Sequence, residues 1–100
     1  MKRTKKSKYK HILINRKKYY FYKITWIDIL GDSGHADANE MRQMQPAVMV
    51  TNAYVFMKDK KRLITFSSYD SNAESFSDRN VFPTGCILKM EKQNLGGNND

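Results

Sequence analysis

Runs of alternating aromatic and β-branched residues, separated by turn-forming residues, dominate this 100-residue sequence. A period of two residues is typical of β-strands that bury one face. We predict five strands, over residues 20–28, 47–57, 63–69, 81–82 and 86–91. Residues 70–80, rich in Ser, Asp and Asn, are expected to form a loop with Phe76 as its apolar anchor. Pro83-Thr84-Gly85 is expected to form a tight turn before the last strand.

One short helix is predicted over residues 37–44. Asp37 can cap it, Glu40 completes a capping-box pattern three residues later, and Pro46 ends it. Both faces of the strand over residues 47–57 are largely apolar, so we expect the helix to cover that strand. The predicted fold is mainly β with one short helix, either a small, strongly bent antiparallel sheet or an SH3-like barrel. A flat sheet of this size would leave long edges unpaired.

The net charge of +8 is concentrated at the N-terminus. Residues 1–18 contain nine Lys or Arg and no acid, whereas residues 19–100 contain nine bases and ten acids. Like charges repel, so we expect a disordered basic arm over residues 1–18, one small domain over residues 19–92 and a flexible tail over residues 93–100. The arm is either a non-specific phosphate-binding segment or a solubilising extension. Its candidate phosphate-binding residues are Lys5, Lys6, Arg16, Lys17 and Lys18.

Cysteine usage and hydropathy indicate the compartment. The single cysteine excludes an internal disulfide, which fits a reducing compartment. The apolar run at residues 12–14 is shorter than the roughly 7–15 residues that a signal peptide needs. The longest apolar run, residues 53–57, falls short of the ~18 residues that span a bilayer. We therefore expect a soluble cytoplasmic protein without a membrane partner.

The sequence offers little catalytic machinery. His35 lies near Asp37 and Glu40, but one His and two carboxylates fall short of a zinc site, and both acids are already explained as helix caps. Cys86 has no neighbouring His to act as its base, so we interpret it as a small core residue. We expect neither an enzyme nor a bound cofactor.

Polar and aromatic residues near the strand ends are the candidates for ligand binding. Trp26 and Tyr69 could stack on a base, with core packing as the alternative. Ser68 and Tyr69 precede the loop over residues 70–80, and Arg79 and Asn80 end it. Groups that can bind a nucleotide, namely a phenol, a guanidinium and an amide, therefore lie at the two ends of this loop. The alternative is that the loop caps itself and Arg79 pairs with an acid. The predicted ligand-binding set is Trp26, Asn52, Ser68, Tyr69, Arg79 and Asn80.

Several short runs resemble a group of very small proteins from tailed phages, over about residues 22–91. They are residues 24–28, 34–35, 46–48, 51–54, 67–70 and 80–87. The Trp-x-Asp in the first run and the Pro-x-Gly-Cys-Ile in the last carry most of the resemblance. It implies a small β-rich domain that acts in the cytoplasm of an infected bacterial host. Some members of the group look like counter-defence proteins that sequester immune signals, including cyclic nucleotides.

These observations favour a phage-type counter-defence protein. We expect it to act as a sponge that sequesters a small anionic nucleotide, such as a cyclic one, without turnover and as a homo-oligomer. The alternative is a nucleic-acid-binding small barrel that uses the basic arm on phosphates. A protein–protein inhibitor of a host enzyme is a further alternative.

Overall fold

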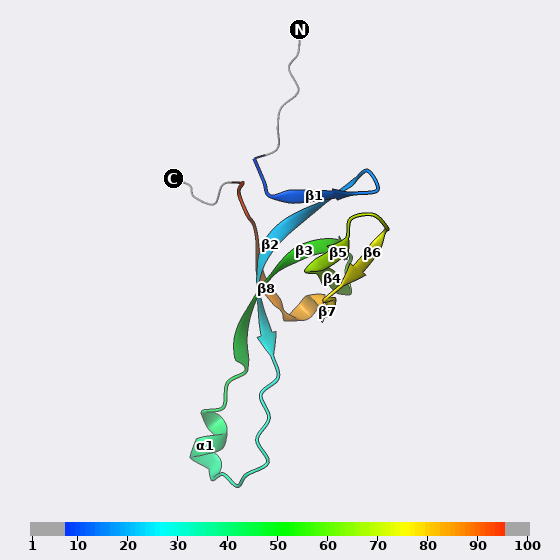
Figure 1. The fold of residues 1–100 in the computed structure, drawn as a ribbon. Coiled ribbons are helices and arrows are strands. Elements are labelled where there is room, and N and C mark those ends of the chain that lie inside the picture. The colour runs from blue at the N-terminus through cyan, green and yellow to red at the C-terminus, as the bar shows by residue number, and fades with distance from the viewer. Residues whose placement is uncertain (1–7, 96–100) are drawn as a thin grey trace.

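The computed structural model describes residues 8–95 (Figure 1). It is mainly β with one short helix, as predicted, and its strands pair antiparallel. Each of the five predicted strands corresponds to an observed strand. The elements are β1 (His11–Ile14), β2 (Lys17–Asp28), α1 (Ala38–Arg42), β3 (Ala47–Lys58), β4 (Arg62–Phe66), β5 (Ser68–Asp70), β6 (Ser75–Ser77), β7 (Asn80–Pro83), the 3-10 helix η1 (Thr84–Cys86) and β8 (Ile87–Lys92).

The main sheet is strongly bent. Its strand order is β1-β2-β3-β4-β7, and β8 also pairs with β2. β3 occupies one side of β2, so β1 and β8 follow one another along the other side. Only the three residues of η1 join β7 to β8, which lie at opposite margins of the sheet, so the sheet must curve to bring these margins together. No ladder joins β7 to β8 within residues 8–95, so the sheet is bent but not a closed barrel.

Two apolar clusters form the core. The first contains Ile14, Tyr19 and Phe66, and the second contains Ile24, Leu63 and Phe82. Side chains alternate between the two faces of a sheet along a strand, so Tyr19 and Ile24 of β2 point to opposite faces. The first half of β2 therefore buries one face and the second half buries the other. On the opposite face of the first half, Tyr20 is half-buried and Tyr22 packs against the second cluster.

The β1–β2 hairpin incorporates part of the basic N-terminus into the sheet. β1 pairs with residues 17–20, and the Ile14 side chain is only 3% exposed. Asn15 and Arg16 have φ values of 52° and 71°, a pair of left-handed residues typical of two-residue hairpin turns. We predicted that the domain begins at residue 19, but the sheet begins at His11. Three apolar residues among lysines are a weak local pattern, and packing with Phe66 gives Ile14 and, in part, Ile12 their role.

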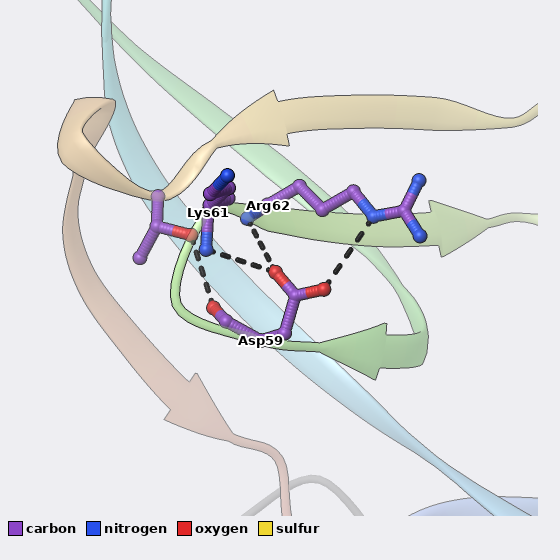
Figure 2. A network of polar contacts seen from close by, with 4 residues as sticks. Asp59, Lys61 and Arg62 are labelled. Atoms are coloured by element: carbon purple, nitrogen blue, oxygen red, sulfur yellow. Dashed lines mark hydrogen bonds and ion pairs between the residues drawn. The ribbon is translucent and has the colours of Figure 1, made fainter.

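Asp59 organises the β3–β4 turn and links it to η1 (Figure 2). Its carboxylate accepts hydrogen bonds from the backbone N–H groups of Lys61 and Arg62 at 2.9 and 2.8 Å, and it forms a 3.6 Å ion pair with Arg62. These two backbone bonds, together with the Arg62 charge, hold the pKa of Asp59 below its ordinary value. The Thr84 hydroxyl donates to the Asp59 carbonyl at 3.2 Å, and Thr84 N–H donates to the Lys61 carbonyl. The turn is thereby attached to the connection that closes the bend.

Residues 29–46, here called the β2–β3 extension, project away from the sheet and carry α1 (Figure 1). The capping box is confirmed, because Asp37 and Glu40 each accept the other's backbone N–H at 2.9 Å. The helix is shorter than predicted, and none of its residues is buried. The expectation that it covers the strand over residues 47–57 was therefore wrong. Local capping determines where this helix starts, but the helix lies on the extension and does not pack against the core.

Residues 70–80 were predicted to be a loop but include the β5–β6 ladder, a second two-stranded sheet. Phe76 is the anchor, as predicted, and its ring centroid lies 4.7 Å from that of Phe66 in the first core cluster. The predicted strand over residues 63–69 is interrupted at Ser67, where β4 ends and β5 begins. The polar composition of this segment gave no sign of the hairpin, which the partly buried Phe76 attaches to the core.

Candidate functional site

Aromatic rings and a lysine gather on one face of β1, β2 and β8. His11 pairs with Tyr20, and Tyr22 pairs with Lys92, so these four side chains share a face. The Lys92 Nζ lies 4.3 Å from the Tyr20 ring centroid, 4.9 Å from that of Tyr9 and 5.9 Å from that of Tyr22. We name Tyr9, His11, Tyr20, Tyr22 and Lys92 the tyrosine–lysine surface.

The core packing of the β1–β2 hairpin determines which face carries this surface. Ile14 and Tyr19 are buried in the first core cluster. Strand alternation then directs Tyr20 and its partner His11 to the opposite face, where both are half-buried and their ring centroids lie 5.5 Å apart. His11 Nδ1 also donates to the Tyr9 carbonyl at 2.9 Å. The surface is therefore held by hydrogen bonds and ring contacts on a folded hairpin.

Charge is distributed unevenly along residues 8–95. Residues 8–27 contain six Lys or Arg and no acid. Residues 28–50, which include the β2–β3 extension, contain four acids and one arginine, and residues 51–95 contain seven bases and five acids. The tyrosine–lysine surface thus lies on the most basic part of the sheet, while the extension is acidic.

Other lysines of this region also lie against aromatic rings. Lys10 Nζ is 4.1 Å from the centroid of Phe21. Lys17 Nζ is 5.6 Å from the centroid of Tyr19 and 5.9 Å from that of Phe56. Such cation–π contacts contribute about 0.5–1 kcal/mol each at exposed sites. They hold the alkyl chains close to the sheet while the charges remain at its surface.

The structure describes three of the five predicted phosphate-binding residues. Lys5 and Lys6 lie outside the described residues. Arg16 is exposed at the β1–β2 turn, and Lys17 and Lys18 are exposed at the start of β2. These last three belong to the β1–β2 hairpin and not to a free arm, so the fold fixes their positions relative to the tyrosines.

Trp26 has a structural role and also borders a cavity. Its Nε1–H donates to Thr51 Oγ1 at 2.9 Å, and its ring packs edge-on against Phe82 with centroids 5.0 Å apart. It lines a cavity of about 280 Å³ together with Asn80. Asn52 is exposed on β3 opposite Lys23 and lines neither this cavity nor those at Arg79. The structure therefore brings Trp26 and Asn80 together but not Asn52.

Ser68 and Tyr69 stabilise the β5–β6 hairpin. The Ser68 hydroxyl donates to Asp78 at 2.6 Å, as the self-capping interpretation of the loop expects. The Tyr69 ring meets Tyr54 and Phe66 edge-on, with both centroid distances 6.3 Å. Tyr69 remains 38% exposed, so its ring is partly accessible from solvent.

Arg79 is the predicted ligand residue that the structure places most favourably. It lines one cavity of about 220 Å³ with Phe56, Phe66 and Phe76, and a second of about 290 Å³ with Asn80. Its guanidinium has no hydrogen-bond or ion-pair partner among residues 8–95, so the alternative of pairing with an acid does not hold there. An unpaired guanidinium beside aromatic rings can receive an anionic group.

The described residues show no metal or thiol centre. Within residues 8–95, no group of three or more His, Cys, Asp or Glu side chains could hold a metal ion. The side-chain oxygens of Asp37 and Glu40 are engaged in the capping box. Cys86 is a free, half-buried cysteine at the end of η1.

The sequence interpretation missed the tyrosine–lysine surface. Tyr20 and Tyr22 stand two residues apart, which is the available signal that they share a face. Nothing local links them to Tyr9, His11 or Lys92, since these residues meet β2 only through the pairing of β1 and β8 with the same side of that strand.

No helix within residues 8–95 combines the length and the apolar composition needed to cross a membrane. The chain matches no family model, and it has no match among curated proteins or solved structures.

Proposed function

We propose that this protein binds single-stranded nucleic acid through the tyrosine–lysine surface. The observation that carries this proposal is the position of Lys92 Nζ, within 6 Å of three tyrosine ring centroids. The surrounding residues 8–27 carry six bases and no acid. Lysines neutralise phosphates, and aromatic rings stack on bases of any sequence. The proposal is the nucleic-acid alternative from the sequence, with the binding surface assigned to the folded sheet.

The spacing of the tyrosines favours a single strand over a duplex. Tyr20 and Tyr22 alternate along β2, so they stand about 6.6 Å apart along the strand. Stacked bases in a duplex rise by only about 3.4 Å per nucleotide. Neighbouring bases must therefore unstack before both half-buried rings can be used, which a single strand does at lower cost.

Fluorescence anisotropy with a labelled oligothymidylate tests this proposal. Tyr20→Leu keeps apolar bulk but removes the aromatic face, and we expect it to weaken binding by on the order of 1–3 kcal/mol, the contribution of one stacked base. Lys92→Gln should reduce the salt dependence of binding by about 0.7 in the slope of log K against log salt, as expected for one lost phosphate contact on a single strand.

Two control variants separate this surface from other parts of the chain. Tyr69→Leu removes a partly exposed ring from the β5–β6 hairpin and should leave affinity unchanged. The double substitution Lys5→Ala, Lys6→Ala removes charge from the N-terminal basic segment. If this double variant abolishes binding while Tyr20→Leu has no effect, the tyrosine–lysine surface is not the binding site.

We propose, as a second candidate function, that the cavities at Arg79 hold a small anionic nucleotide. The Arg79 guanidinium, which has no partner among residues 8–95 and lines a cavity with Phe56, Phe66 and Phe76, favours this candidate. The half-buried rings of Phe56 and Phe76 provide stacking contacts, and the guanidinium provides a two-donor fork for a phosphate. The site suits the sequestration of a nucleotide signal that the resemblance to small phage proteins implies.

A thermal-shift panel of cyclic dinucleotides, cyclic trinucleotides and NAD-derived nucleotides tests the second candidate. A ligand present at 100 times its Kd should stabilise the fold by roughly 2.7 kcal/mol. Arg79→Gln should remove the shift, and Arg42→Gln, in the exposed helix α1, should preserve it. A panel without any shift would reject sequestration while leaving the oligonucleotide result unaffected.

A further inference from the structure

The outer side of β3 has a long stretch without a neighbouring strand. β2 pairs with one side of β3 throughout residues 47–54, whereas β4 pairs with the other side only at residues 54–58. On that second side, residues 47–53 face no strand within the described chain. Every second residue of this stretch therefore presents an unpaired backbone N–H and C=O.

This edge lacks the features that usually protect a strand from pairing with another chain. Such features are short length, charged side chains and proline. β7 has four residues and ends in Pro83, β1 has four residues next to lysines, and β8 carries Lys89, Glu91 and Lys92. By contrast, residues 47–53 read Ala-Val-Met-Val-Thr-Asn-Ala and contain no charge and no proline.

Apolar side chains surround the unpaired edge. Val48 and Val50 are 62% and 51% exposed on one face of β3. They lie opposite the half-buried Ile27 and Thr25 of β2. The adjoining β2–β3 extension adds four exposed residues, namely Ile29, Leu30, Met41 and Met44. An apolar patch of this kind marks an interaction surface in a folded protein.

We propose that a second copy of this chain occupies the edge, with the two β3 strands paired antiparallel about a two-fold axis at Val50. This arrangement places Val50 beside the partner's Val50 and Val48 beside the partner's Asn52. All the paired side chains from residues 47–53 are uncharged, so the segment is compatible with itself. The two bent sheets would join into one continuous sheet, an isologous interface typical of two-fold dimers. The inference does not depend on either proposed function.

Charge complementarity favours a second copy as the occupant. Antiparallel pairing directs the start of one β3, and the extension attached to it, towards the end of the partner's β3. The extension carries Asp32, Asp37 and Glu40 against one arginine. The β3–β4 turn at the other end carries Lys58, Lys60, Lys61 and Arg62 against the single acid Asp59. Each acidic extension would therefore approach the basic turn of the other copy.

Disulfide trapping in the full chain tests both the interface and its register. In a Cys86→Ser background, Val50→Cys places two thiols on the two-fold axis, with Cα atoms about 4.5–5.5 Å apart. Disulfides form at about 4.4–6.8 Å between Cα atoms, so mild oxidation should produce a covalent dimer. Val48→Cys is the matched control, because its two copies would lie about 13 Å apart along the strands and should not cross-link.

Light scattering across a range of concentrations provides the second measurement. The unmodified chain should dimerise, and Val50→Lys should abolish the dimer because two lysines would face each other across the axis. Val81→Lys, at a similarly exposed valine on β7, should leave the dimer intact. A monomer at every concentration, a dimer that survives Val50→Lys, or cross-linking of Val48→Cys as readily as Val50→Cys would each overturn the proposal.

Discussion

The indole Nε1–H of Trp26 on β2 donates a 2.9 Å hydrogen bond to Thr51 Oγ1 on β3. Thr51 is paired with Ile24, so the bond runs diagonally between the two strands on one face. The same indole ring packs edge-on against Phe82 of β7. Trp26 therefore connects three strands across the bend, and this packing role coexists with its place beside the Asn80 cavity.

Thr51→Val should destabilise the fold. The substitution keeps the side-chain volume but leaves the partly buried indole N–H without its acceptor, at a cost of about 1 kcal/mol or more. A change of 1 kcal/mol moves the melting temperature of a domain this size by roughly 4–8 °C. Thermal melts followed by circular dichroism measure the effect. An unchanged melting temperature would show that solvent replaces Thr51 at no cost.

Thr65→Val should have the opposite effect. Thr65 is fully buried, and its hydroxyl has no hydrogen-bond partner among the described residues. Burying an unsatisfied hydroxyl costs about 1–3 kcal/mol, so an isosteric apolar side chain should raise the melting temperature. Thr51→Val serves as the matched comparison, since it makes the same chemical change at a satisfied hydroxyl. A lower melting temperature for Thr65→Val would mean that the hydroxyl has a partner in solution.

Arg16→Gly should stabilise the β1–β2 turn. Arg16 has a φ of 71°, a left-handed conformation that costs an ordinary L-residue about 1–2 kcal/mol and costs glycine nothing comparable. Part of this gain is offset by the greater freedom of glycine in the unfolded chain, so we expect a net gain of about 0.5–1 kcal/mol. Urea denaturation of the variant measures it.

Lys18→Gly is the control for that turn, because it removes the same charge two residues away at a regular strand position. It should lose about 0.5–1 kcal/mol. Equal losses of stability in the two variants would contradict the type of turn assigned to Asn15 and Arg16.

The stability of the fold should decline in alkali. Burial, and to a smaller extent the Glu74 carboxylate, raise the pKa of the Tyr19 phenol, and burial followed by the nearby Tyr69 raises that of Tyr54. Below the ordinary tyrosine pKa of about 10, both phenols are neutral in the folded and unfolded chains. Above it, the unfolded chain ionises first, so the free energy of unfolding falls as pH rises.

Melting temperatures measured across this alkaline range test the prediction. The double variant Tyr19→Phe, Tyr54→Phe should show a shallower decline than the unmodified chain between about pH 9 and 11. Tyr20→Phe, at a half-buried position outside both core clusters, should reproduce the decline of the unmodified chain. Parallel curves for all three proteins would contradict the assignment.

Sequence neighbours are the contacts that a local pattern can predict. Arg79 and Asn80 were predicted as ligand residues because they end one polar segment; both line one cavity, and their ligand role stays a prediction. Asp37 and Glu40 were identified as a capping box because their spacing alone determines that contact. The meeting of Lys92 with Tyr20 spans most of the chain, and no local pattern specifies which edge of β2 will receive β8.

The sequence by itself determined five of the strands and the helix cap of this protein, because residue alternation and capping are interactions between near neighbours in the chain. The tertiary structure decided the rest. It placed His11–Ile14 in the sheet, although the lysines around these residues predicted a free arm. It also placed α1 away from the core and left residues 47–53 of β3 without a partner strand on the side opposite β2. These outcomes depend on which strand edges pair and on how the bent sheet buries apolar area, and both are properties of the whole chain.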